Sequence, residues 1–503
     1  EFEKSKGNKR KLLELLSRLS RIKFFDPACG SGNFLIISYK EMRRLEVDII
    51  KELGIFAFPG ISLSQFYGIE IDDFAHEIAK LSLYLAEHQM NIEFEKEFGK
   101  VNPTLPLKTS GRIVHDNATR IKWENVCPKQ ENDEIYILGN PPYMGARVQE
   151  KKHKSDIDYV FSGFKKYKDL DYIACWFYKA SEYVSGHNAR FAFVSTNSIC
   201  QGEQVALLWP ILFNFNLEIF FAYTSFKWAN NAKHNAGVTV VIVGIENYQK
   251  DNVKTLYSSC QQRTVGNISP YLAEGRNIIV QRRTSPLSSL PSMQFGNMPN
   301  DGGALILENF EKEKIENSYP SSRQFFRRLV GSSEFLRGSM RWCLWIENNK
   351  VDDAKRIPVI AERIGEVRKH RLKSKDTGTN KLANRSHQFR DINIAKNHLF
   401  IIPSVSSGRR AYIPMGMLDN SCIVSNSAQV IYDSEPWILG VISSRIHMTW
   451  VRAVAGRLKT DYRYSTALCY NTFPISDLTI KQKEEITLHV YAILEEREKY
   501  SEK

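Results

Sequence analysis

Apolar and polar residues alternate along the first half of the chain with the rhythm of strands and helices. Short apolar runs predict buried strands, and most are followed by longer stretches with apolar residues at helical spacing. The expected strands cover residues 22–25, 66–70, 135–138, 190–195, 218–223 and 237–245, and the expected helices 1–21, 34–46, 74–88, 172–184 and 204–212. This order predicts an α/β fold whose open, mostly parallel sheet carries helices on both faces. The last two strands lack a long helix between them, so we expect an antiparallel hairpin at one edge of the sheet.

The rhythm changes near residue 250. Residues 260–303 are rich in Ser, Pro, Gly and Asn, which is typical of an irregular connection. After it the pattern predicts a charged helix at 352–373, short strands at 399–402, 411–413 and 430–432, and a helix at 481–500. We therefore expect a first domain at 1–250, a mixed α+β domain at 251–480 and a C-terminal helix at 481–503.

Composition indicates a globular protein with a basic region. The 503 residues are too many for one core, and the net charge is +13. Residues 321–480 contain 25 Lys and Arg against 13 Asp and Glu, so most of the excess lies there. Such a region is typical of a protein that binds a phosphate backbone, although a solvated surface has the same composition.

The cysteines and the apolar runs indicate a protein of a reducing compartment. The eight cysteines form no CxxC pair and have no His at ligand spacing, so we predict no metal site and no disulfide framework. No apolar stretch reaches the roughly 18 to 20 residues that span a bilayer, and we expect no membrane partner.

A glycine-containing loop, Asp26-Pro27-Ala28-Cys29-Gly30-Ser31-Gly32-Asn33-Phe34, follows the first expected strand. Gly30 and Gly32 permit a tight turn and a close approach of a ligand to the backbone. Asp26 suits the positive groups of S-adenosylmethionine better than a pyrophosphate, and neither a GxxxxGK[ST] loop nor a full GxGxxG is present. The loop residues expected to bind this cofactor are Asp26, Ala28, Gly30, Gly32, Asn33 and Phe34.

Two further acidic positions follow expected strands. Glu70 ends the second strand, where a carboxylate can accept both ribose hydroxyls; as an isolated residue it is equally well explained as a helix cap. Ile71 beside it is expected to pack on the adenine face. Asp116, with Asn117, ends a third strand at 112–115, and its carboxylate can accept from the exocyclic amine of the cofactor.

The strongest chemical signal is the tetrapeptide Asn140-Pro141-Pro142-Tyr143, directly after a short apolar strand. Two consecutive prolines stiffen the backbone there. The Asn140 amide oxygen and the Pro141 carbonyl can then point into one volume and accept both hydrogens of an exocyclic amine. Such positioning supplies most of the catalysis in a methyl transfer and needs no strong general base. Tyr143 offers a flat face for stacking a base that has left the duplex.

In this order the segments resemble the motifs of S-adenosylmethionine-dependent amino-methyltransferases. Residues 26–34 resemble motif I, 67–72 motif II, 115–118 motif III and 140–143 motif IV. The gamma class of DNA adenine-N6 methyltransferases has this order, in which the cofactor motifs precede the catalytic motif and the recognition domain comes last. The resemblance implies a Rossmann-like class I methyltransferase sheet and a partner of double-stranded DNA. It also places Phe226 or Trp228 in motif VIII, whose aromatic residue packs on the flipped adenine.

The resemblance extends into the second half. Residues 341–346, 403–414 and 450–474 resemble the type IIL and IIG single-chain restriction-modification enzymes, whose C-terminal domain reads the DNA sequence. Arginine can pair with guanine edges, whereas lysine more often meets phosphates. The basic residues expected to contact DNA are Arg409, Arg410, Arg452, Arg457, Lys459 and Arg463. The basic stretch 151–168 either clamps the backbone beside the flipped base or forms a mobile loop.

Relatives also carry two parts that this sequence lacks. No PD…(D/E)xK constellation is convincing, so restriction is not predicted for this chain, and a nuclease module is expected upstream in a longer protein. Motif X, which completes the methionine end of the cofactor pocket, is missing as well. The resemblance implies a prokaryotic, cytoplasmic enzyme, of which this chain is expected to be a fragment.

Two other functions stay open from the sequence. The NPPY tetrapeptide also serves protein glutamine-N5 and some RNA adenine methylation, although a basic region of about 250 residues favours DNA. A DNA-binding specificity module without catalysis is the second alternative, and the intact tetrapeptide disfavours it.

Overall fold

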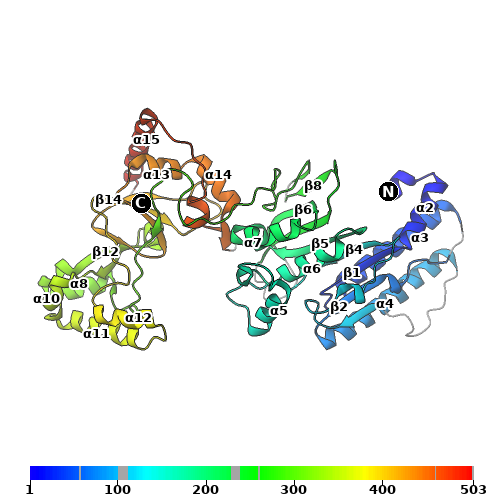
Figure 1. The fold of residues 1–503 in the computed structure, drawn as a ribbon, viewed down its shortest axis with the longest axis horizontal. Coiled ribbons are helices and arrows are strands. Elements are labelled where there is room, and N and C mark those ends of the chain that lie inside the picture. The colour runs from blue at the N-terminus through cyan, green and yellow to red at the C-terminus, as the bar shows by residue number, and fades with distance from the viewer. Residues whose placement is uncertain (56–57, 100–110, 228–237, 259–260, 459, 501–503) are drawn as a thin grey trace. The chain divides into compact units, whose positions relative to one another are not determined.

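The computed structural model describes residues 1–55, 58–99, 111–227, 238–258, 261–458 and 460–500. These residues form two compact units, Glu1–Ile279 and Val280–Lys503, which are described separately below (Figure 1). None of the described helices is both long and apolar enough to cross a membrane.

The first unit is built on one sheet, in which nine strands are described. They are β1 (Ile22–Asp26), β2 (Phe66–Glu70), β3 (Arg112–His115), β4 (Glu134–Gly139), β5 (Ala189–Thr196), β6 (Leu217–Lys227), β7 (Thr239–Asn247), β8 (Lys254–Tyr257) and β9 (Gln262–Val265). Their order is β3-β2-β1-β4-β5-β7-β6-β8-β9. Neighbours from β3 to β5 are parallel, and β7 runs antiparallel to both β5 and β6. The mostly parallel α/β sheet is therefore confirmed.

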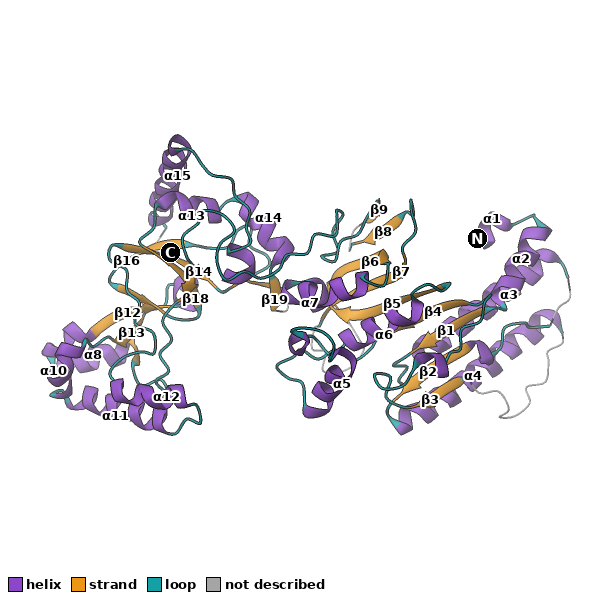
Figure 2. Cartoon of the chain, in the orientation of Figure 1, coloured by secondary structure: helices purple, strands orange, loops and turns teal. Residues whose placement is uncertain are grey.

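Both faces of this sheet are buried beneath helices. Neighbouring residues of a strand point to opposite faces, so they join different cores. On β2, Phe66 joins the core beneath α2, α3 and α4, whereas Tyr67 joins the core beneath α6 and α7. The helices of this unit are α1 (Phe2–Ser5), α2 (Lys9–Leu19), α3 (Asn33–Leu53), α4 (Asp73–Phe98), α5 (Lys151–Phe161), α6 (Ala174–Val184) and α7 (Gly202–Phe213), as Figure 2 shows.

The structure differs from the expected elements in three places. The helix expected at 1–21 is interrupted, because Gly7 has a positive φ of 74° and Asn8 caps α2 with its side chain. The β6–β7 hairpin is antiparallel but does not lie at the edge, since β8 and β9 extend the sheet beyond it. The same two strands move the division of the chain from residue 250 to after Ile279.

Three small sheets are described in the second unit. Their orders are β10-β18-β14-β16, β11-β13-β12-β17 and β15-β20-β19. The strands are β10 (Gln294–Phe295), β11 (Ile306–Glu308), β12 (Phe326–Val330), β13 (Arg341–Leu344), β14 (His398–Pro403), β15 (Val405–Ser406), β16 (Gly416–Asp419), β17 (Cys422–Val424), β18 (Ala428–Tyr432), β19 (Gly456–Leu458) and β20 (Asp461–Arg463). The expected mixed α+β architecture is present.

Helices lie around these sheets. They are α8 (Asn309–Ser318), α9 (Ser332–Arg337), α10 (Val351–Lys355), α11 (Pro358–Leu372), α12 (Thr377–Lys381), α13 (Pro436–Ile442), α14 (Arg445–Val454) and α15 (Ile480–Glu498). The helix expected at 352–373 is two helices, because Pro358 cannot continue α10 and instead begins α11. The strand expected at 411–413 is wrong: that segment is irregular, and the nearest following strand is β16.

The C-terminal helix belongs to the second unit. α15 packs on α13, where a Cβ at Gly440 would lie 2.5 Å from the side chain of Ile486. Val490 is buried in the same core, and Arg497 donates to the carbonyl of Met415 at 2.6 Å.

Candidate active site at the carboxyl ends of the first sheet

A cavity of about 560 Å³ opens at the carboxyl ends of β1, β2, β3 and β4, where open α/β sheets bind ligands. Its volume is within the range of small-molecule sites. It is lined by Pro27, Ala28, Ile69, Glu70, Ile71, Asp116, Asn117, Ala118, Arg120, Asn140, Pro142, Lys152, His153, Ser155, Asp156, Tyr172 and Trp176. Residues from three separate sequence predictions, the loop after β1, the acidic positions and the tetrapeptide, thus meet at one site.

Asp26 ends β1 and is completely buried. Its Oδ1 accepts from the Ala28 N–H at 3.0 Å, and none of the described residues donates to its Oδ2. Burial, supplemented by the negative charge of Glu70, raises the pKa of Asp26 to about 7. Asp26 therefore lies beneath the cavity rather than on its wall.

The turn in the loop after β1 depends on the backbone conformation of two glycines. Gly30 and Gly32 have φ of 53° and 84°, which side chains rarely adopt. A Cβ at Gly32 would lie 3.3 Å from the Cβ of Ala79, so the glycine also permits close packing of α3 on α4. Asn33 and Phe34 begin α3 and, like Gly30 and Gly32, do not line the cavity as described.

Glu70 braces two loops at once. Its Oε2 accepts from the Gly30 N–H at 2.8 Å, and its Oε1 accepts from Ile71 and Asp72, each at 2.9 Å. A carboxylate oxygen has about two acceptor positions, so Oε2 keeps one for a ligand hydroxyl. Glu70 does not cap a helix, because the N-cap of α4 is Asp72, whose side chain accepts from the Ala75 N–H. The ligand-binding explanation for Glu70 stays a prediction.

Asp116 and Asn117 differ in their availability. Asp116 is exposed on the cavity wall and accepts only from the Asn117 N–H, at 2.6 Å, among the described residues. The Asn117 amide is already engaged: Nδ2 donates to Asp156 at 3.3 Å, and Oδ1 accepts from both the N–H and the hydroxyl of Thr119. Asn117 therefore shapes the wall, whereas Asp116 can still accept from a ligand.

The tetrapeptide leaves β4 as an irregular segment. Asn140 is exposed on the cavity wall, and no described residue forms a hydrogen bond with its amide. Pro141 is buried, Pro142 lines the cavity, and Tyr143 is half-buried against the core of the unit without lining this cavity.

The segment just after the tetrapeptide is anchored to the residues that lead into α6. The Met144 N–H donates to Asp171 Oδ1 at 2.8 Å, and the Tyr172 N–H donates to the Met144 carbonyl at 3.0 Å. Asp171 is buried, and this burial raises its pKa. Trp176 of α6 donates its ring N–H to the Pro27 carbonyl at 3.0 Å, which also ties the loop after β1 to the helix.

The wall formed by α5 was missed by the sequence predictions. Lys152, His153, Ser155 and Asp156 line the cavity from this helix, within the stretch 151–168 for which two explanations had stayed open. Part of that stretch is therefore an ordered helix. Its only sequence signal was the run of lysines, which does not identify Asp156.

Asp156 joins three segments of the wall. It accepts from Arg120 Nε and from the Tyr172 hydroxyl, each at 2.7 Å, in addition to Asn117. The pKa of Tyr172 is raised by burial and by this hydrogen bond. Arg120 also lies 4.7 Å from the centre of the Tyr159 ring. The cavity wall is therefore held by a nearly buried carboxylate.

The two candidates for motif VIII have different outcomes. Phe226 lies on β6 opposite Val240, beside a β-bulge, and is half-buried. It does not line the cavity as described. Trp228 lies outside the described residues, so the choice between the two stays a prediction.

In the second unit, two expected DNA contacts lie on the smallest sheet. Arg457 is on β19 and Arg463 on the paired strand β20. The Arg457 guanidinium lies 3.7 Å from the centre of the Tyr462 ring and donates to the Thr460 carbonyl at 3.4 Å. Arg463 is exposed, with no hydrogen bond or ion pair from its side chain to a described residue.

The remaining candidates surround the same sheet. Arg409 and Arg410 are exposed in the turn after β15, which pairs with β20. Arg452 is exposed near the end of α14 and donates to the Ala411 carbonyl at 3.3 Å. Lys459 lies outside the described residues. The fold thus gathers the five described arginines around one three-stranded sheet.

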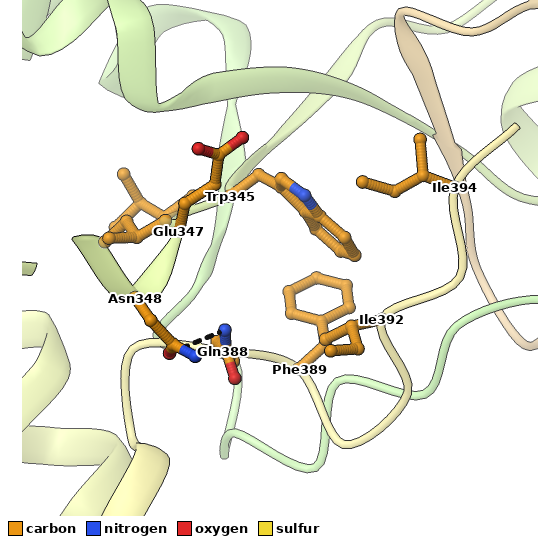
Figure 3. A pocket seen from close by; sticks show the side chains of 9 residues that line it. Trp345, Glu347, Asn348, Gln388, Phe389, Ile392 and Ile394 are labelled. Carbon is orange, nitrogen blue, oxygen red and sulfur yellow. Dashed lines mark hydrogen bonds between the residues drawn. The ribbon is translucent and has the colours of Figure 1, made fainter. Parts of the chain in front are cut away.

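The second unit also contains a separate cavity of about 170 Å³ (Figure 3). Trp345 and Phe389 lie in its wall with ring centres 5.6 Å apart, and the rest is mainly apolar. The Gln388 amide donates to Asn348 Oδ1 at 3.1 Å, so these polar groups satisfy each other, as the dashed line in Figure 3 shows. Among the described residues that line this cavity, the Glu347 carboxylate is left without a hydrogen-bond partner, whereas the site in the first unit presents Glu70, Asp116 and Asn140 together.

Known proteins match both units. The family model for the MmeI DNA-methyltransferase domain matches residues 2–258, and that for the MmeI target recognition domain matches residues 274–477. DNA methyltransferase A of Bacillus subtilis (strain 168) is 53% identical over 494 residues, which cover 97% of this chain and 56% of that protein. The solved structure of the type IIL restriction-modification enzyme MmeI in complex with DNA has a TM-score of 0.90 at 40% identity, covering 99% of this chain and 68% of that one. This chain spans little more than half the length of the Bacillus relative. It belongs to the MmeI family, and it contains that family's DNA-methyltransferase and target recognition domains.

Proposed function

We propose that this chain transfers a methyl group from S-adenosylmethionine to N6 of a flipped-out adenine in duplex DNA, within a restriction-modification system. The observation that carries the proposal is the position of Asn140. Its free amide lies on the wall of a cavity that also presents Glu70 and Asp116. The MmeI relative supports the restriction-modification context.

The hydrogen-bond acceptors and the apolar surface of the cavity fit S-adenosylmethionine. Glu70 Oε2 keeps an acceptor position for a ribose hydroxyl, and Asp116 is free to accept from an adenine amine. Ile71 and Ile69 supply apolar surface for the adenine ring. The cofactor supplies an electrophilic methyl group on a sulfonium sulfur. We assign Ala28, Glu70, Ile71 and Asp116 to cofactor binding, with Asp26, Gly30, Gly32, Asn33, Phe34 and Asn117 supporting them.

Asn140 would then hold the amine that receives the methyl group. Its Oδ1 and the Pro141 carbonyl accept the two amine hydrogens, which fixes the nitrogen and draws its lone pair out of conjugation with the ring. Buried Pro141 and the anchor from Met144 to Asp171 keep these acceptors in place. Because positioning and fixed dipoles supply the catalysis, no side chain has to remove a proton before transfer. The amine nitrogen is positively charged once it carries the methyl group, and it then loses one hydrogen as a proton to water.

The second unit would select the DNA site. The arginines around the β15-β20-β19 sheet are suited to base edges and phosphates, and Arg457 is oriented by Tyr462. Tyr143 is assigned to stacking on the flipped base, with Phe226 or Trp228 on its other side. A peptide substrate would leave this basic unit without a role, and the matches to a DNA-methyltransferase domain and a target recognition domain favour DNA over RNA.

Tritium-labelled S-adenosylmethionine tests the proposal. The protein is incubated with duplex DNA, with RNA of the same sequence, and with a glutamine-containing peptide, and the labelled products are separated by chromatography. We expect label in N6-methyladenine of the duplex alone. Label in methylcytosine would overturn the adenine assignment, and label in RNA or in peptide would overturn the assignment of duplex DNA as the substrate. Duplex binding without any transfer would instead favour a specificity module.

A further inference from the structure

A second group of cations precedes the arginines around the β15-β20-β19 sheet in the chain. The group lies on the end of α11, on the connecting loop and on α12. Its members are all exposed: Arg368, Lys369, Lys373, Lys375 and Lys381. Within the described part of the chain, none of these five side chains forms an ion pair or a hydrogen bond. We call these five residues the α11–α12 patch.

The charge around the patch is strongly unbalanced. Residues 363–396 contain ten Lys and Arg but only three Asp and Glu, namely Glu366, Asp376 and Asp391. Asp376 is already used as the N-cap of α12, where it accepts from the Thr379 N–H. Asp391 lies 3.8 Å from Arg390, which is outside the patch. The positive charge of the patch is therefore not neutralised by its neighbours.

Arg371 fixes the segments that carry the patch. It is completely buried, and its guanidinium donates to five backbone carbonyls at 2.7–3.1 Å. The acceptors are Pro299, Asn300, Leu382, Arg385 and Gln388. This single side chain joins α11 to the segment after α12 and to the segment at Pro299 and Asn300. In addition, α11 and α12 lie side by side (Figure 1). The five cations are thus presented by an ordered framework.

A structural explanation covers only part of the patch. Cations near the last turn of a helix are stabilised by the helix dipole, typically by about 0.3–1 kcal/mol each. This accounts for Lys369 and Lys373 at the end of α11 and for Lys381 in the last turn of α12. Lys375, in the loop, gains nothing from that dipole, while five uncompensated charges repel one another.

We propose that the α11–α12 patch binds the phosphate backbone of duplex DNA, independently of sequence and in addition to the arginines around β19 and β20. Four of the five residues are lysine. Lysine contacts phosphate as a point charge rather than reading base edges. The inference rests on the proposed function only in taking duplex DNA as the partner, and it makes no use of methyl transfer.

The test is the salt dependence of binding. The triple variant Lys369→Gln, Lys373→Gln, Lys375→Gln is compared with the parent on a fluorescent 30-base-pair duplex of arbitrary sequence. Each phosphate contact that is lost lowers the slope of log Kd against log salt concentration by about 0.9. We expect a decrease approaching about 2.7 for three contacts, with similar weakening on a duplex of scrambled sequence.

A matched control separates local contact from net charge. Lys314, Lys355 and Lys481 are also exposed lysines of the second unit without ion pairs to described residues. Their triple change to Gln removes the same charge, and we expect a much smaller decrease in slope. Equal decreases in both variants, or no decrease in the patch variant, would overturn the proposal. Unchanged thermal unfolding of both variants confirms that the framework around Arg371 is intact.

Discussion

The backbone of Gly139 lies against the carboxyl group of Asp26. A Cβ at Gly139 would lie 2.5 Å from Asp26 Oδ1 and 3.1 Å from its Cγ. This approach follows from the parallel pairing of β1 with β4, which aligns Phe25 with Ile137. The first cofactor motif and the residue before Asn140 are therefore one packed unit.

The contact predicts that Gly139→Ala displaces the catalytic tetrapeptide. Overpacking costs about 1–3 kcal/mol of stability, and displacing Asn140 by about 1 Å lowers turnover roughly 10²-fold. Steady-state methylation with S-adenosylmethionine measures the second effect. Gly145→Ala is the matched control, since a Cβ there meets nothing within 4 Å. Equal activity of the two variants would refute the packing argument.

Asp26 should make stability depend on pH. Burial raises its folded pKa to about 7, whereas its ordinary value is 3.8. The folded state holds this proton where the unfolded chain has released it, so stability falls as pH rises from about 4 to 7. Urea unfolding at pH 5 and pH 8 should show a larger loss for the parent than for Asp26→Asn, which has no carboxyl group to titrate. The same pH dependence in both proteins would contradict the assignment to Asp26.

Asn140→Ala should remove turnover while duplex binding is retained. The variant lacks the amide acceptor for the amine, and no described residue loses a hydrogen bond, because the Asn140 amide forms none. A loss of 10²-fold or more in kcat is expected, with a Kd for DNA within about twofold of the parent. Anisotropy and single-turnover methylation give the two quantities. An active variant would show that Asn140 does not hold the amine.

Much of this site was predictable, because its residues follow strands in an order that sets their position. In a parallel sheet, Asp26, Glu70, Asp116 and Asn140 must lie at one edge, since each either ends a strand or directly follows one. The sequence pattern contained no corresponding rule for α5, which comes after the tetrapeptide and returns to the cavity. The helix carries Asp156 there through side-chain contacts with Arg120 and Tyr172, and such contacts have no periodic signal.

The same limits apply to the second unit. Arg371 is one arginine among many in a basic region, and only its burial and its five carbonyl acceptors distinguish it from the surface cations. The irregular segment at 411–413 is a short apolar run, which is typical of a strand. It lies instead between β15 and β16 and supplies the carbonyl of Ala411 to Arg452.

Asp156→Asn should weaken cofactor binding without affecting DNA binding. An amide cannot accept from Arg120, Tyr172 and Asn117 together, so at least one donor on the cavity wall loses its partner. An unsatisfied buried donor costs about 1–3 kcal/mol, which corresponds to a 5- to 150-fold weaker Kd for S-adenosylmethionine if the wall shifts to satisfy it. Calorimetric titration of the cofactor and anisotropy with duplex DNA measure the two affinities.

Asp158→Asn is the control, since Asp158 is exposed on the same helix and is not among the residues that line the cavity. A purely structural role for Asp156 would lower thermal stability and leave the cofactor affinity of the folded protein unchanged. A selective rise in KM for the cofactor, with kcat retained at saturation, is the outcome that identifies Asp156 as a positioning residue.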